Sequence, residues 1–378
     1  MDYNMQVPLS KPEIDEHEIE AVTNVLKSGW LAHGPKNKEF EANFAEYIGV
    51  KHAIAFNSCT SALQIALEAY SLKGEVIVPS FTFVASANSI VLAGCKPLFA
   101  DISYDTCNID PEDIRKKITK KTVAIMPVHY AGQPCNMKEI MEIAEEFNLK
   151  LIEDSAETLG GEFNGQKTGT FGVGCFSFFP TKNITTGEGG MLTTNDDGIL
   201  ERVNELKAHG ISSSTFQREK VNKPWLRDAV VPGYNFRLCD ILAAIGVEQM
   251  KKVDKLNNLR RKHASYLNKE LNIDGIDIPI EKPNTKHVYQ MYTIKLAQDI
   301  NRSSFLKVLR EKGVGASVHF DPPVHLQSYY QKMYKGLNLP VTEDVANRIV
   351  TLPMYPSMTK RELSYIVDSV KSALRSRK

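Results

Sequence analysis

Apolar residues recur at two alternating spacings through about the first 210 residues. Ile19, Val22 and Leu26 follow the three- to four-residue spacing of a helix, and Ser28-Gly29 behind them is typical of a helix end. A second helical stripe begins at residue 40. Short apolar runs, which are typical of buried strands, lie at 53–56, 75–80, 96–101, 122–128 and 149–154.

Two of the expected helices have recognisable starts. Asp110 precedes Pro111, which is the order of an N-cap residue and a proline at the first helical position. Asn136 is expected to cap another helix, whose apolar face includes Ile140 and Ala144. Strands that alternate with helices predict right-handed crossovers and a mainly parallel sheet covered by helices on both faces.

The pattern changes after this region. Residues 211–233, with Ser212–Ser214, Pro224 and Pro232, predict a long loop, and long loops in compact domains are often functional. The elements expected beyond it are helices at 238–252, 255–271, 302–312 and 359–375 and strands at 288–296 and 314–320. We therefore expect a large domain at 1–250 and a small C-terminal domain at 251–378.

Composition excludes several classes of protein. A chain of 378 residues favours two domains, and its 46 Lys and Arg against 45 Asp and Glu argue against a nucleic-acid binder. No apolar run approaches the roughly 18–20 residues that span a bilayer, and no secretory signal is recognisable. The six cysteines form no CxxC pair, which predicts reduced thiols in a cytoplasmic protein, and no histidine cluster suggests a metal site.

Asp154 ends the apolar run 149–154. Ligands of open parallel sheets bind at the carboxyl ends of the strands, so this carboxylate is a candidate site residue. A turn or helix-capping role after the strand is the alternative.

Lys182 follows the aromatic segment 176–180 and precedes a turn rich in threonine and glycine. A lysine in a loop is usually a solvated surface charge. Apolar surroundings, however, can free its amine to attack a carbonyl group.

Residues 57–61 read Asn-Ser-Cys-Thr-Ser and open a helix after the apolar run 53–56. The exposed N–H groups of a helix start, together with the adjacent hydroxyl groups, suit a phosphate. Ordinary capping by serine and threonine is the alternative.

Together these elements match what pyridoxal 5'-phosphate (PLP) requires: a lysine, a carboxylate for the pyridine nitrogen and a phosphate cradle. Phe83, just past a strand end, is a candidate to stack on the cofactor ring, or else a core aromatic residue.

The sequence resembles the DegT/DnrJ/EryC/StrS family of sugar aminotransferases over nearly its whole length. The segment around Lys182 is the most specific of the matching segments, which are 7–12, 28–35, 79–83, 126–132, 152–157, 176–191, 233–237 and 324–327. The resemblance implies an α/β protein with the PLP-dependent transferase fold type I. That fold has a large domain with a mainly parallel sheet between helices and a smaller α+β C-terminal domain.

The resemblance also implies roles for individual residues. Lys182 would be the Schiff-base lysine and proton shuttle, and Asp154 would pair with the pyridine nitrogen. Phe83 would stack on the ring, and Glu157 would lie beside the ring hydroxyl. Asn235 would reach the phosphate of a second chain, so that a homodimer shares its active sites. The phosphate ligands would be Ser58, Cys59, Thr60 and Ser177, and candidates for the substrate side are Arg237, His319 and His325, each of which can instead have a structural role.

Two positions depart from many relatives, which have glycine in place of Cys59 and glutamine or histidine in place of Glu157. A dehydratase branch replaces the lysine by histidine, so Lys182 favours transamination. The implied reaction moves an amino group, by analogy from glutamate, to a nucleotide-linked keto-deoxy sugar, with the fourth carbon as the expected position.

Three alternatives stay open at this point. The enzyme can act on another sugar position or on a cyclitol ketone. The chain can also be a non-catalytic PLP-binding regulator, although both Lys182 and Asp154 are present. The third alternative is a short-chain dehydrogenase or a nucleotide-binding protein on a doubly wound sheet. Such a protein would need a GxGxxG turn after its first strand, and the glycines cluster around Lys182 instead.

Overall fold

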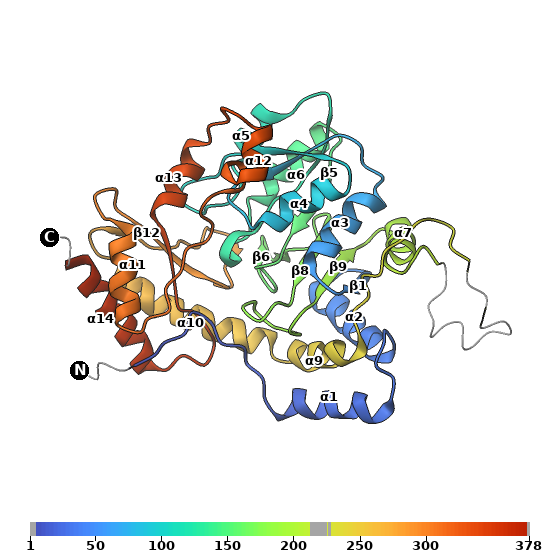
Figure 1. Cartoon of the computed structure of the whole chain (residues 1–378), viewed down its shortest axis with the longest axis horizontal. Coiled ribbons are helices and arrows are strands. Elements are labelled where there is room, and N and C mark those ends of the chain that lie inside the picture. The colour runs from blue at the N-terminus through green and yellow to red at the C-terminus, as the bar shows by residue number, and fades with distance from the viewer. Residues whose placement is uncertain (1–4, 212–224, 226–227, 376–378) are drawn as a thin grey trace.

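The computed structural model describes residues 5–211, 225 and 228–375. Its centre is a seven-stranded sheet in the order β1-β9-β8-β5-β4-β2-β3 (Figure 1). β9 pairs antiparallel with both β1 and β8, and the other pairs are parallel, so six strands share one direction. The expected mainly parallel α/β sheet is confirmed. The strands are β1 (His52–Phe56), β2 (Glu75–Pro79), β3 (Lys96–Ala100), β4 (Thr122–Ile125), β5 (Lys150–Asp154), β8 (Val173–Ser177) and β9 (Gly190–Thr194).

Helices cover both faces of this sheet because successive residues of a buried strand point to opposite sides. Val76 and Val78 belong to the apolar cluster that includes α3 and α4, whereas Ile77 between them packs with α5 and α6. Phe176 packs with α2 and α9. The helices of this part are α1 (Glu16–Ser28), α2 (Pro35–Ile48), α3 (Cys59–Ala69), α4 (Val84–Leu92), α5 (Pro111–Lys117), α6 (Met137–Glu146), α7 (Asp197–Lys207) and α9 (Asp240–Met250).

Of the two helix starts expected from the sequence, one has the expected side-chain cap and the other does not. Asp110 caps α5 by accepting a hydrogen bond from the Glu112 N–H group, as predicted. Asn136 occupies the N-cap position of α6, but its side chain makes no cap bond and donates to Glu139 instead. The helix therefore begins after Asn136 as predicted, but the Asn136 side chain does not cap it.

The C-terminal part has a separate antiparallel sheet, β10-β12-β13, with α10, α11 and α14 packed around it at one end of the molecule (Figure 1). A further small sheet has the strand order β11-β6-β7. In it, residues 285–286 of the C-terminal part pair with residues 162–163, which follow β5 of the large sheet in the chain. The remaining elements are β6 (Glu162–Phe163), β7 (Gln166–Lys167), α10 (Val253–Leu271), β10 (Ile276–Asp277), β11 (Thr285–Lys286), β12 (Tyr292–Leu296), α11 (Arg302–Glu311), α12 (Ser328–Met333), α13 (Pro340–Arg348), β13 (Ile349–Leu352) and α14 (Lys360–Arg375).

Two expected strands differ from the structure. The strand at 288–296 is shorter, because the Val288 and Met291 N–H groups donate to carbonyls of residues 132 and 131 rather than to a strand. The strand at 314–320 is wrong: this segment makes only isolated bridges, from Val314 to Val7 and from Ser317 to Thr351. Neither bridge continues into a ladder with its partner segment.

The apolar clusters bear on the domain division. Val7 packs in the same cluster as side chains of α10, β12 and α14, so the N-terminal segment joins the C-terminal part. Conversely, Tyr330 and Leu339 pack in the cluster of the large sheet. The division at residue 250 stays a prediction. Of the loop expected at 211–233, Ser212–Ser214 and Pro224 lie outside the described residues, and Ile211 bridges Ala229.

In the described part of the chain, no helix combines the length and the apolar character that crossing a bilayer requires.

Candidate active site

A cavity of about 380 Å³ lies at the carboxyl ends of β2, β5 and β8. The start of α3 and the segment around Phe320 complete its wall. Its lining includes nine of the residues expected at the site: Ser58, Cys59, Thr60, Phe83, Asp154, Glu157, Ser177, Lys182 and His319. It does not include Asn235, Arg237 or His325.

Asp154 is only 5% exposed. Its Oδ2 accepts a hydrogen bond from Ser86 Oγ at 2.7 Å, and its Oδ1 accepts one from the Ala156 N–H group at 3.2 Å. Burial raises the pKa of Asp154, whereas these hydrogen bonds and the charge of Lys182 oppose the shift. The bond to Ala156 is a turn contact, so the structural alternative is present in a residue that also lines the cavity.

Lys182 is not a solvated surface charge. Its side chain is 17% exposed, and Nζ donates to Glu157 Oε1 at 3.3 Å. The other oxygen of Glu157 accepts from the Ala131 N–H group at 2.8 Å, which fixes the carboxylate. The Lys182 amine therefore faces the cavity beside a buried, oriented carboxylate.

The backbone around Lys182 is held by two buried residues that the sequence reasoning missed. Gln290 Nε2 donates to the Thr181 carbonyl at 2.8 Å. Arg260 donates to the carbonyls of Gln290, Met354 and Lys182. Burial lowers the pKa of Arg260 to about 10, so it stays charged at neutral pH. No local pattern identified these residues, because their contacts are all to distant segments.

The start of α3 forms a cradle of backbone N–H groups. Ser58 is the N-cap and accepts from the Ser61 N–H group at 3.1 Å, so ordinary capping is present as well. A Cβ at Gly190 would lie 2.4 Å from Ser58 C and 2.5 Å from Cys59 N, which means that this wall tolerates no side chain. Burial raises the pKa of the Cys59 thiol and keeps it protonated. The cradle therefore fits a phosphate group.

Phe83 is 62% exposed and is not a core aromatic residue. It stands at the N-cap position of α4 and lines the cavity. Its ring centroid lies 6.3 Å from that of Phe320. An exposed ring at a cavity wall suits stacking on a planar ligand.

The substrate-side candidates separate into two groups. His319 lines the cavity, its Nδ1 lies 2.9 Å from Thr351 Oγ1, and burial lowers its pKa. His325 is buried away from the cavity, with its ring nitrogens bonded to Ser80 Oγ and Glu343. The prediction that His325 contacts substrate is therefore not supported, because neither ring nitrogen is turned toward the cavity.

Asn235 forms an isolated β-bridge with Ala208, and Arg237 forms one with Phe56. Asn235 is exposed, and the guanidinium of Arg237 lies 3.3 Å from His209 Nε2. Neither reaches the cavity of its own chain.

The residues present thus fit PLP: an amine, a buried carboxylate, an exposed ring and a backbone cradle converge on one cavity. The chain matches the DegT/DnrJ/EryC1/StrS aminotransferase family over residues 12–371.

Similar proteins extend over almost the whole chain. An uncharacterized protein of Methanocaldococcus jannaschii is 42% identical over 97% of both chains. The spore coat polysaccharide biosynthesis protein SpsC of Bacillus subtilis is 36% identical over 98% of both. Among solved structures, the Helicobacter pylori aminotransferase PseC, involved in pseudoaminic acid biosynthesis, superposes with a TM-score of 0.92 at 30% identity, covering 98% of this chain and 100% of PseC. The chain belongs to the DegT/DnrJ/EryC1/StrS family and is a PLP-dependent sugar aminotransferase.

Proposed function

We propose that the chain moves an amino group from an amino acid, by analogy glutamate, to the keto group of a nucleotide-linked keto-deoxy sugar at its fourth carbon. The observation that carries this proposal is the Lys182 amine, held 3.3 Å from Glu157 in the cavity that Asp154 also lines. The relatives' names, which concern a spore coat polysaccharide and pseudoaminic acid, support a role in surface sugar synthesis. Amination of another sugar position or of a cyclitol ketone is the alternative.

The chain's own residues supply binding, orientation and proton transfer. Lys182 Nζ, partly shielded from water, can take a proton from a carbon at the cavity centre and return it to a neighbouring atom. Glu157 orients this amine, and the buried Asp154 can hold a positive charge on a ring nitrogen. PLP, when bound, supplies the electron sink for the carbon that loses its proton.

The charges around the cavity support a site shared between two chains. Among the described lining residues, Lys182 is the one lysine or arginine, whereas Asp154, Glu157 and Glu188 are acidic. A cofactor phosphate and a nucleotide diphosphate both need positive partners. We propose that a second copy of the chain supplies some of them.

Two surface features of the described chain fit a homodimer. Asn235 is exposed and outside its own cavity, which suits contact with the phosphate of a neighbouring site. Ile19 and Leu26 of α1 are 53% and 54% exposed, so the predicted apolar stripe of this helix faces outward. An outward apolar stripe suits burial against a second copy.

We also propose a cytoplasmic location, because all six cysteines are free thiols.

Complementation between inactive variants tests both proposals. Lys182→Ala should abolish turnover and the absorption of bound PLP while the far-ultraviolet circular dichroism stays unchanged. Mixing it with Asn235→Ala should restore activity through hybrid dimers. Undiminished turnover of Lys182→Ala would overturn the aminotransferase mechanism. Absent recovery despite demonstrated subunit exchange would overturn the shared site.

A screen of nucleotide-linked keto sugars with glutamate tests the substrate. Product mass and stereochemistry should show one amine at the fourth carbon. Amination elsewhere on the sugar, or of a cyclitol ketone alone, would contradict the proposed substrate. PLP binding without turnover of any ketone would favour a regulatory protein.

A further inference from the structure

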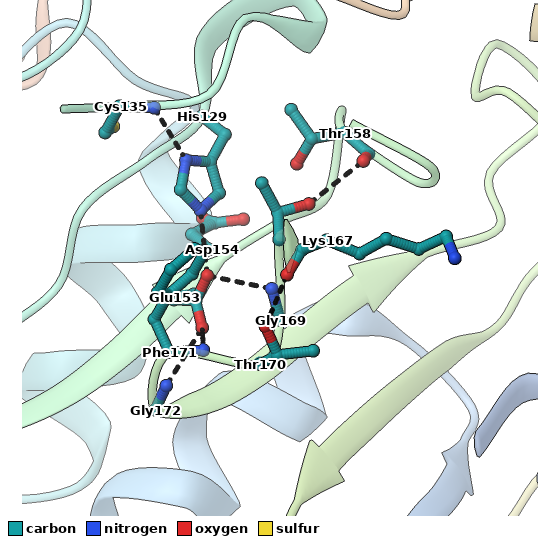
Figure 2. Close-up of polar contacts among 12 residues, drawn as sticks. His129, Cys135, Glu153, Asp154, Thr158, Lys167, Gly169, Thr170, Phe171 and Gly172 are labelled. Carbon is teal, nitrogen blue, oxygen red and sulfur yellow. Dashed lines mark hydrogen bonds and ion pairs between the residues drawn. The ribbon is translucent and has the colours of Figure 1, made fainter. Parts of the chain in front are cut away.

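Glu153 occupies an unusual position directly beside Asp154. The two residues are neighbours on β5, so their side chains point to opposite sides of the strand. The Glu153 side chain has no exposed surface, yet both of its oxygens are fully partnered (Figure 2). It thus lies behind the cavity wall rather than in it, because it is absent from the cavity lining.

Four N–H groups meet this carboxylate. Oε1 accepts from the Phe171 and Gly172 backbone at 2.8 and 3.0 Å, and Oε2 accepts from the Gly169 backbone at 2.8 Å. The fourth partner is His129 Nε2 at 3.2 Å from Oε2.

The geometry fixes the proton positions in this cluster. His129 Nδ1 accepts a hydrogen bond from the Cys135 N–H group at 3.0 Å, so the proton of the neutral ring lies on Nε2 and is donated to Glu153 (Figure 2). Both oxygens face N–H donors, so a proton placed on the Glu153 carboxyl group would find no hydrogen-bond acceptor. It is therefore an ionised, acceptor-only hub.

Three segments that build the cavity meet at this hub. The His129 segment carries Val128, which lines the cavity, and Ala131, whose N–H group holds Glu157. The His129 N–H group also donates to the Asp154 carbonyl at 3.1 Å. The turn 169–172 leads directly into β8 (Val173–Ser177), whose end carries the segment of Lys182.

We propose that Glu153, through His129 and the turn 169–172, is the positioning residue that sets the relative placement of Asp154 and the Lys182 segment. This inference rests on the proposed roles of Asp154 and Lys182 toward the cofactor. It assigns no contact between Glu153 and substrate.

The primary variant is Glu153→Gln, which keeps the shape but turns one acceptor into an N–H₂ donor. That donor must face at least one backbone N–H group, so the turn 169–172 has to shift. We expect the PLP dissociation constant, measured by absorbance titration well below the melting temperature, to rise at least ten-fold. The absorption maximum of the bound cofactor should also move.

Asp240→Asn is the matched control. Asp240 is also buried, at 2% exposed, and accepts from the Gly34, Lys36 and Asn37 backbone and from Asn37 Nδ2, but it ties α2 to α9 and does not line the cavity. A purely structural role predicts that both variants lose stability and neither loses cofactor affinity. Positioning predicts that only Glu153→Gln loses affinity.

Two His129 variants provide a test that does not depend on Glu153→Gln folding. The amide nitrogen of Gln reaches the place of Nε2 and can still donate to Glu153, whereas the oxygen of Asn replaces Nδ1 and keeps only the Cys135 bond. We expect His129→Gln to retain PLP affinity within about three-fold and His129→Asn to lose about ten-fold or more.

The outcomes distinguish the inference from the proposed function. If the wild-type chain binds no PLP, the proposed roles of Lys182 and Asp154 fail. If it binds PLP and Glu153→Gln binds equally well, or if the His129 variants are affected in the opposite order, only the positioning role is overturned. An equal loss of affinity in Asp240→Asn would overturn it as well.

Discussion

Replacing Asp154 by Asn should stabilise the cofactor-free protein while impairing the enzyme. The carboxylate is buried, and burial raises its pKa above the ordinary value. A carboxyl group with a raised folded-state pKa favours the folded state at low pH, and this contribution is lost as the pH rises through that pKa. At a pH above this raised pKa, the ionised carboxylate is therefore a cost to the cofactor-free protein.

The expected change in the free energy of unfolding is the difference between two opposing contributions. Burying an ion costs several kcal/mol, of which the hydrogen bonds from Ser86 and Ala156 return about 1.5–3 kcal/mol each. Asn keeps one acceptor, and the Ser86 hydroxyl can turn toward Thr82, 2.8 Å away. A net gain of about 1 kcal/mol, or about 2 °C in melting temperature, is expected for the cofactor-free variant at pH 7.

Thermal unfolding of cofactor-free wild type and Asp154→Asn across pH 4–8 measures this difference. The advantage of the variant should shrink as the pH falls and the wild-type carboxyl group takes up a proton. Added PLP should raise the melting temperature of the wild type more than that of the variant. Turnover should fall about 100-fold, equivalent to about 3 kcal/mol for a broken buried ion pair.

Two results would refute this reasoning. A cofactor-free variant less stable than wild type at neutral pH would mean that the ionised carboxylate is not a cost. Equal stabilisation of both proteins by PLP, with unchanged turnover, would remove Asp154 from the cofactor site.

Two further predictions concern the cradle and the C-terminal part. Gly190→Ala should weaken PLP binding at least ten-fold, because its Cβ would overlap the backbone of Ser58 and Cys59; Gly198→Ala, whose Cβ meets only a side-chain oxygen at 3.3 Å, should bind PLP normally in the same titration. Burial lowers the pKa of His287 from 6.5 to about 3, so unfolding becomes easier as the pH falls below 6.5. The loss should reach about 2 kcal/mol at pH 5, at 1.36 kcal/mol per pH unit, and urea unfolding should show a smaller slope with pH in His287→Phe.

Much of the large sheet and of the cofactor side of the cavity could be predicted from local patterns. The run that became β2 is apolar because both of its faces are buried, and Asp110-Pro111 is followed by a helix because both residues act within one turn. Lys182 and Asp154 were identifiable because each carries its chemistry in its own neighbourhood, an aromatic and glycine-rich segment or a strand end.

The substrate-side candidates were harder to assign. His325 follows a family motif, but its ring bonds Ser80, 245 positions away in the chain. The segment 314–320 is apolar, but it forms only single bridges to Val7 and Thr351, and local pattern does not show whether a partner segment will pair with it along its length. No local sequence pattern identified Ser86 or Arg260. Ser86 donates a hydrogen bond to Asp154, and Arg260 donates one to the Lys182 carbonyl.

By itself, the sequence determined which segments are buried, where several helices begin and end, and which side chains could perform PLP chemistry. Only the tertiary structure decided which of those side chains share a cavity, which histidine faces it, and that Glu153 joins three segments behind it. The physical reason is that periodicity records whether a residue is buried, whereas the partner of a buried polar group is chosen by how distant segments pack. Every such group must find a partner, and only the folded chain decides which one.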